Sequence, residues 1–216
     1  MAGRLVSDYR AADFFGRVFL DTATLTALVT FAFATSITPG PNNMMLFASG
    51  VNFGFRRTIP HMLGIGAGFL SLLIGVGLGL GALLATVPVL YTGLKIAGGL
   101  YLLSIAWKIG SSRTLGEGSI SGRPMTFLGA AAFQWVNPKA WVMAVTAMTV
   151  YVDDQSYLSS VILVGVVFAA VNLPSVSTWA GFGSVLREWL SVPARLKWFN
   201  ITMALLLVAS LWPMLR

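Results

Sequence analysis

The chain has 216 residues, of which 56% are hydrophobic and only 10% are charged, and its mean hydropathy is +0.81. This composition excludes an ordinary soluble domain and indicates a polytopic membrane protein. The net charge of +7 arises from 14 Lys and Arg strung along the predicted loops, so it does not indicate a nucleic-acid partner, and the lack of cysteine excludes disulfides and thiolate chemistry.

Residues 1–21 form a polar tail in which acidic and basic side chains alternate, with no cleavable apolar core, so no signal peptide is expected. About 20 apolar residues cross a bilayer as a helix. A single transmembrane domain at 22–215 is therefore predicted to be all-α, with six transmembrane helices. They lie at about 22–50, 61–86, 89–107, 126–150, 157–183 and 198–215, and the longest loop is at 110–125.

The first segment contains a run that cannot continue an α-helix, Thr38-Pro39-Gly40-Pro41-Asn42-Asn43. Proline removes a backbone donor and clashes with the preceding turn, and glycine has no fixed φ. In hydrocarbon each freed N–H or C=O costs several kcal/mol unless protein or a water-filled cavity satisfies it. The run therefore predicts a helix break that lines a polar cavity.

The second segment carries four glycines whose spacing predicts one helix face, Gly64, Gly68, Gly75 and Gly79. Small residues let membrane helices approach closely, so a packing surface is the simpler interpretation and a sliding surface is the functional alternative. His61 at the start of this segment and Asp21 before the first one are the proton-coupling candidates. A histidine at the membrane interface is alternatively just hydrated.

The fourth segment contains a second break, Gln134-Trp135-Val136-Asn137-Pro138-Lys139. Lys139 is costly near the bilayer centre unless it is paired or hydrated, and snorkelling to water is the alternative to a binding role. A half-helix that begins at Asn42 or Lys139 directs its N–H groups at the cavity and attracts a carboxylate. Asn172 in the fifth segment is expected to complete the cavity. The predicted substrate-binding residues are Thr38, Pro39, Gly40, Pro41, Asn42, Asn43, Gln134, Asn137, Pro138, Lys139 and Asn172.

The two breaks indicate an internal repeat, because Pro39 and Pro138 lie 99 residues apart and the Leu-Lys pairs at 94–95 and 196–197 lie 102 apart. The two units lie at about 22–109 and 126–215 and have three spans each. Because three is an odd number, the second unit runs in the opposite direction across the bilayer. Such inverted repeats are typical of secondary transporters.

Basic loops remain in the cytoplasm, which predicts the orientation. Both termini and the acidic turn at Asp153 and Asp154 are then expected on the periplasmic side. The basic residues assigned to the cytoplasmic side are Arg56, Arg57, Lys108, Arg113, Arg123, Arg187, Arg195 and Lys197, against Arg4, Arg10, Arg17 and Arg216 on the other side.

Over residues 22–215 the chain resembles the LysE/RhtB family of amino-acid exporters. The resemblance is carried by the six short spans and by Thr38-Pro39-Gly40-Pro41-Asn42, Gly99-Leu100-Tyr101-Leu102 and Asn137-Pro138-Lys139. Asn42-Asn43, Gly54-Phe55-Arg56 and Ala106-Trp107-Lys108-Ile109 are similar to the cysteine and O-acetylserine exporter branch, whereas the long charged leader departs from the family pattern. The resemblance implies a secondary-active exporter in the bacterial cytoplasmic membrane, driven by the proton motive force.

No Asp or Glu lies deep in a span, which favours a small neutral amino acid, of the cysteine/O-acetylserine or homoserine/threonine type, over a cationic one. The expected partners are this substrate and the lipid bilayer, with no cofactor and no metal, and a homo-oligomer is left open. One His and no Cys supply no nucleophile and base pair, so an enzyme is not expected. The alternative is an intramembrane binding or scaffold protein without a transport cycle.

Overall fold

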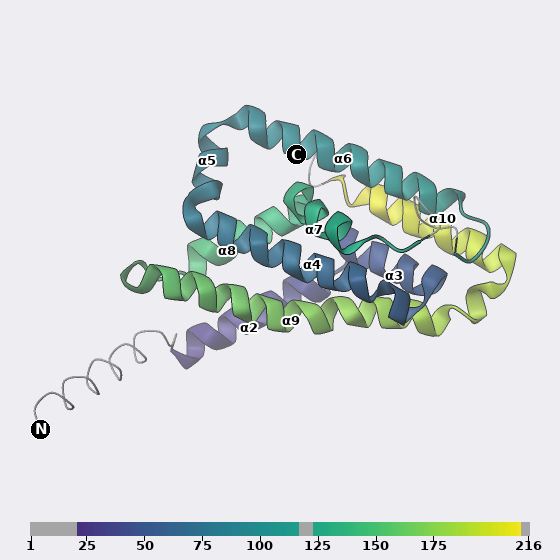
Figure 1. Ribbon diagram of the computed structural model, residues 1–216, viewed down its shortest axis with the longest axis horizontal. Coiled ribbons are helices and arrows are strands. Elements are labelled where there is room, and N and C mark those ends of the chain that lie inside the picture. The colour runs from purple at the N-terminus through teal and green to yellow at the C-terminus, as the bar shows by residue number, and fades with distance from the viewer. Residues whose placement is uncertain (1–20, 117–122, 213–216) are drawn as a thin grey trace, which may run out of the picture.

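The computed structural model describes residues 21–116 and 123–212, and all regular elements in this part of the chain are helices (Figure 1). The predicted tail up to residue 20 and the arginines at 4, 10, 17 and 216 lie outside the described residues. The α-helices are α2 (Thr22–Ile37), α3 (Pro41–Phe53), α4 (Phe55–Gly75), α5 (Gly81–Thr86), α6 (Pro88–Ser111), α7 (Phe127–Val136), α8 (Pro138–Tyr151), α9 (Tyr157–Leu186) and α10 (Pro193–Ala209).

Both predicted helix breaks are confirmed. Helix α2 ends at Ile37 and α3 begins at Pro41, with a bend of 55° between them. Helix α7 ends at Val136 and α8 begins at Pro138. In each case a proline occupies the first helical position, where its missing N–H removes no intrahelical hydrogen bond and its fixed φ suits the helix. The prolines therefore start the second half of each broken pair.

Two described helical stretches are long and apolar enough to cross a membrane, Phe55–Leu80 and Asp154–Leu186. A third is added if the bent pair α2 and α3 counts as one span. The other predicted spans correspond to α6, to the α7 and α8 pair and to α10. Helices α7, α8 and α10 have 10, 14 and 17 residues, each shorter than a bilayer-spanning helix.

Connections along the chain alternate between the two ends of the bundle. In Figure 1 the α3–α4, α6–α7 and α9–α10 connections lie at one end, and the α5–α6 and α8–α9 connections lie at the other. The basic residues assigned above to one side of the membrane belong to the first set of connections or to the helix ends beside them. Asp153 and the 3₁₀ turn Asp154–Ser156 belong to the second set.

The glycine surface of α4 packs against α7. A Cβ on Gly64 would collide with the carbonyl oxygen of Phe127, and one on Gly68 would lie 2.5 Å from Ala131. A similar approach joins α3 to α9, because a Cβ on Gly50 would collide with the backbone of Ala180 and one on Gly183 with that of Phe47. Packing is therefore confirmed for the first two glycines of the predicted face.

The prediction for the second segment was wrong in two respects. Helix α4 begins at Phe55 rather than at 61, because Gly54, with φ of 81°, ends α3 and lets the next helix start at once. The regular helix also stops at Gly75, and the π-helical turn Val76–Leu80 contains Gly79 with φ of 100°. This left-handed residue redirects the chain, so Gly79 leaves the glycine face, and a Cβ added to it would meet no described atom within 4 Å.

Candidate functional site

The two breaks meet across the bundle. The Lys139 ammonium at the start of α8 donates to the carbonyl and to the hydroxyl of Thr38, both at 2.9 Å. In return, the Asn42 and Gln134 amides exchange two hydrogen bonds, of 2.7 and 3.0 Å. The beginning of each second half-helix thus contacts the end of the first half-helix of the other pair. Lys139 does not simply snorkel, because protein oxygens hold its ammonium.

The carbonyls left over at the end of α2 are satisfied by side chains from other elements. The Asn43 amide nitrogen donates to the carbonyls of Ser36 and Thr38, both at 2.8 Å, and the Trp179 indole of α9 donates to the Ile37 carbonyl at 3.0 Å. Because these bonds occupy its amide nitrogen, Asn43 stabilises the break itself.

The second break is satisfied by residues close in the chain. The Asn137 side chain accepts from the backbone N–H of Lys139 at 3.2 Å and so caps α8. The Trp141 indole donates to the Trp135 carbonyl at 2.7 Å, and the Gln134 amide donates to the Ala130 carbonyl at 3.0 Å. Each donor lies within six residues of its acceptor, so the chain around this break supplies its own partners.

Asn172 has a buried oxygen without a partner among the described residues. Its side chain is 6% exposed, and its amide nitrogen donates to the Ser36 hydroxyl at 3.2 Å. Its Oδ1 accepts no hydrogen bond from the described part of the chain. An unsatisfied buried acceptor costs about 1–3 kcal/mol. This oxygen is therefore a position for a bound N–H or O–H group.

A small cavity brings most of the predicted binding residues together. Its volume is about 30 Å³, roughly the share of one water molecule in the liquid. No carboxylate of the described chain lines it, and the Asn42–Gln134 amide pair forms part of its wall. Thr38, Pro39 and Pro138 shape the breaks without lining the cavity. The predicted residues that line it are Gly40, Pro41, Asn42, Asn43, Gln134, Asn137, Lys139 and Asn172.

The two proton-coupling candidates lie in different environments, both away from this cavity. Asp21 caps α2, accepting from the N–H groups of Ala23 and Thr24, and the hydrogen bond from the Thr24 hydroxyl holds the pKa of Asp21 below its usual value. His61 is 2% exposed, and neither of its ring nitrogens has a partner within residues 21–116 and 123–212. His61 lies within α4 rather than at its start, since α4 begins earlier than expected, and its hydration stays a prediction.

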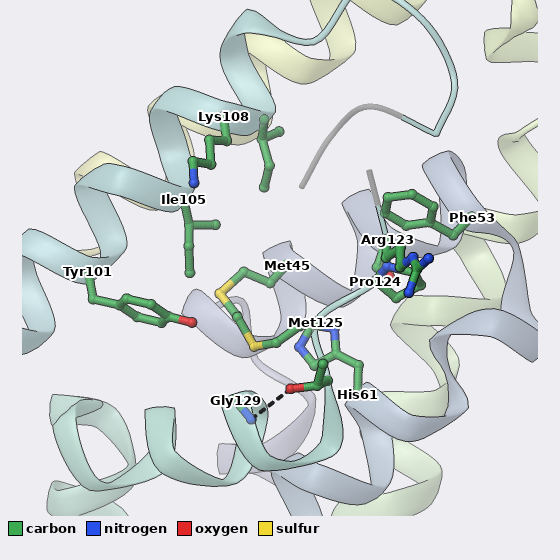
Figure 2. Close-up of a pocket in the computed structure, with 13 residues that line it drawn as sticks. Met45, Phe53, His61, Tyr101, Ile105, Lys108, Arg123, Pro124, Met125 and Gly129 are labelled. Carbon is green, nitrogen blue, oxygen red and sulfur yellow. Dashed lines mark hydrogen bonds between the residues drawn. The ribbon is translucent and has the colours of Figure 1, made fainter. Parts of the chain in front are cut away.

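A second cavity, which the sequence did not predict, lies between α3, α4, α6 and the start of α7 (Figure 2). Its volume is about 220 Å³, about seven times that of the small cavity. His61 faces it from α4, and Tyr101 and Lys108 line it from α6. A sequence signal for it existed, because His61 shares the helical spacing of Gly64, Ile65 and Gly68 and so belongs on the buried face of α4.

Comparison with known proteins gives a consistent picture. Residues 33–209 match the family described as LysE type translocator. The chain is 33% identical over 186 residues to the cysteine/O-acetylserine efflux proteins of Escherichia coli strain K12 and of Shigella sonnei strain Ss046, covering 85% of this chain and 93% of those proteins. No solved structure matches the chain.

Proposed function

Because the chain belongs to the LysE type translocator family, we propose that it is a secondary-active exporter of small neutral amino acids or their derivatives. It is a multi-pass membrane protein and a transporter rather than an enzyme. The cysteine/O-acetylserine efflux relatives make these two compounds the first substrates to test, with homoserine and threonine next.

The cavity between the two breaks is the proposed substrate site. Lys139 and the N-terminal ends of α3 and α8 offer positive charge to a carboxylate, and the Asn172 oxygen, unpartnered within the described chain, offers an acceptor to an ammonium group. This pairing of a cation with an unsatisfied acceptor around one cavity is the observation that carries the proposal. It matches the two charged groups of a zwitterion.

The lining of this cavity also supports a neutral side chain on the substrate. A lysine or arginine substrate has a second positive charge, which is expensive to bury without a carboxylate. None of the described residues around the cavity is acidic, and the remaining wall contains Ile65, Phe69 and Met143. Small substrates with an apolar or hydroxyl-type side chain fit this lining best.

The contacts support the proposal of two inverted three-helix units with six spans in total. Thr38 contacts Lys139 while Asn42 contacts Gln134, and this reciprocity is what a two-fold axis in the membrane plane produces. Likewise α2 packs on α9 as α7 packs on α4, which joins the first half of each broken pair to the long helix of the other unit. We place the end with the basic connections in the cytoplasm, and both termini on the opposite side.

The transport cycle that we propose for this site is alternating access. The Asn42–Gln134 pair forms part of the wall of this cavity of about 30 Å³, and we propose that the pair separates when a substrate binds. We propose that the two units rock about the breaks and expose the site to each side in turn. His61 and Asp21 remain the candidates for carrying the coupled proton, with His61 favoured because its buried ring has no partner in the described chain.

Transport is tested by uptake of radiolabelled O-acetyl-L-serine into inside-out vesicles in the presence of a proton gradient. The parental chain is expected to accumulate it, and Asn172→Ala is expected to lower the rate about tenfold, as befits loss of one hydrogen bond to a charged group. Ser177→Ala is the matched control, because the Ser177 hydroxyl on the same helix bonds to the carbonyl of Leu173 in its own helix.

The same vesicles distinguish an exporter from a binding or scaffold protein that does not transport. Such a protein binds O-acetyl-L-serine without accumulating it, and its breaks serve packing alone. If the parental chain shows no accumulation and no counterflow with any small neutral amino acid, the exporter proposal is wrong.

A further inference from the structure

The larger cavity lies on the route between the basic end of the bundle and the small cavity. Met45 lies one turn beyond Asn42 along α3, and His61 lies one turn before Ile65 on α4. Both steps lead away from the breaks and toward the α3–α4 connection, at the end assigned to the cytoplasm (Figure 1). The two cavities thus follow one another along α3 and α4.

His61 is the strongest sign that the larger cavity holds a ligand. Neutral imidazole has one N–H donor and one acceptor nitrogen, and both are buried without a partner among the described residues. Burying each of them unsatisfied costs about 1–3 kcal/mol. Figure 2 shows the ring facing the space into which Tyr101 and Lys108 extend from α6. A ligand that enters this space and contacts the ring can donate to its acceptor nitrogen.

The lining defines the chemical class of that ligand. Lys108 and Arg123 line the cavity and no acidic residue of the described chain does, so an anionic group is favoured. Met45, Met125 and Ile105 provide an apolar wall that suits a short uncharged side chain. The hydroxyls of Ser49 and Thr58 are already bonded to each other at 2.9 Å, whereas His61 and Tyr101 present polar groups to the cavity.

We propose that the larger cavity is a vestibule site that binds a small amino acid with an uncharged side chain before it reaches the breaks. Its carboxylate lies toward Lys108 and Arg123, and its ammonium group donates to the His61 imidazole. The identity of the ligand rests on the proposed function, but the presence of the site does not. The site is distinct from the cavity at the breaks, since His61, Lys108 and Met125 line the larger cavity alone.

Substrate protection of a single thiol tests the vestibule site in the full chain, which has no native cysteine. Met125→Cys places the thiol in the cavity, and Leu128→Cys places a control thiol three residues on, where the side chain is 75% exposed. In proteoliposomes, millimolar O-acetyl-L-serine is expected to slow maleimide labelling of Met125→Cys about threefold or more, with no effect on Leu128→Cys. Equal labelling of Met125→Cys with and without the compound would overturn the proposal.

The role of His61 is tested in the same background. His61→Phe keeps a ring but removes both nitrogens, and it is expected to abolish protection, whereas His61→Gln keeps a donor and an acceptor and is expected to retain part of it. Protection that survives His61→Phe unchanged would exclude the imidazole as a partner.

Equilibrium binding of radiolabelled O-acetyl-L-serine provides a second measurement that does not need labelling. Ile105→Phe fills the vestibule and is expected to weaken binding about fivefold or more, and Ile96→Phe is the control on the same helix because Ile96 is 59% exposed. Unchanged binding in Ile105→Phe would contradict the vestibule site.

The two proposals fail in different ways. Protection without any transport by the parental chain would disprove the exporter and leave the vestibule standing. Transport by the parental chain without protection of the thiol, and without an effect of Ile105→Phe on binding, would disprove the vestibule site and leave the exporter proposal standing.

Discussion

The two helix breaks occupy corresponding positions in the two proposed units, but the partners of their backbone groups come from different parts of the chain. At the first break, Lys139 and Trp179 reach across from α8 and α9 to the carbonyls at the end of α2. At the second, the hydrogen bonds made by backbone groups join residues within six of each other, while the Gln134 and Trp135 side chains bond to Asn42 and Ser71 on other helices. The first break therefore depends on how the rest of the bundle is placed, whereas the second is largely self-contained. A change of conformation can therefore break and re-form the hydrogen bonds of the first break more readily than those of the second.

The largest expected effect comes from removing the cation that joins the breaks. Lys139→Met deletes two hydrogen bonds of 2.9 Å to Thr38, and hydrogen bonds to charged groups contribute about 1.5–3 kcal/mol each. We expect O-acetyl-L-serine transport to fall about 100-fold or more. Lys197→Met, at an exposed lysine of α10, is the control. Parental transport rates in Lys139→Met would show that the contact between the breaks has no role.

The next prediction compares the indole donors of the two breaks. Trp179→Phe leaves the Ile37 carbonyl without its donor, and Trp141→Phe does the same to the Trp135 carbonyl. Each is expected to lower the free energy of unfolding by about 1–3 kcal/mol. Only Trp179→Phe is expected to lower transport as well, by about tenfold. Equal effects of both variants on transport would remove the distinction between the breaks.

The amide pair between the breaks is tested by a double-mutant cycle. Asn42→Leu and Gln134→Leu each remove both bonds of the pair, so the double variant is expected to lose less stability than the sum of the two single ones. A coupling energy of about 0.5–3 kcal/mol in the unfolding of the detergent-solubilised protein is the expected result. Additive losses would mean that the two amides act independently.

The smallest expected effect is that of Gly40→Ala. Gly40 has an extended backbone, with φ of −176°, so alanine introduces no backbone strain. Its Cβ would lie 2.9 Å from Lys139 Cδ, and the flexible lysine can shift by a few tenths of an ångström. We expect a two- to threefold loss of transport, about 0.5 kcal/mol, and no change for Gly66→Ala, where no described atom lies within 4 Å of the added Cβ. A larger loss would mean that the position of Lys139 is more tightly fixed than its flexibility implies.

The breaks could be predicted from the sequence because proline and glycine chemistry is local. Pro41 and Pro138 each occupy the first position of a helix, which their fixed φ and missing N–H favour. The contact of Thr38 with Lys139 could not be predicted as a contact, since it joins residues 101 apart and depends on packing of the whole bundle. Nor could the left-handed Gly79, because glycine adopts either sign of φ at no cost.

The start of the second segment was misplaced for a different reason. The predicted span began at 61, whereas the helix begins at Phe55, directly after the left-handed Gly54. The buried periodicity of α4 was a better guide than its polarity. The larger cavity could not be predicted either, because it is formed by side chains of four separate elements that no local sequence pattern connects.

The backbone contact between α3 and α9 has a mechanical consequence. At Gly50 and Gly183 the two helices touch main chain to main chain, with no intervening side chains that could yield or slide. Because α3 belongs to the first proposed unit and α9 to the second, this contact is expected to serve as a pivot when the units rock. Asn42 sits on α3 and Asn172 sits on α9. Rocking about this pivot is therefore expected to change the position of the Asn42–Gln134 pair relative to the Asn172 oxygen.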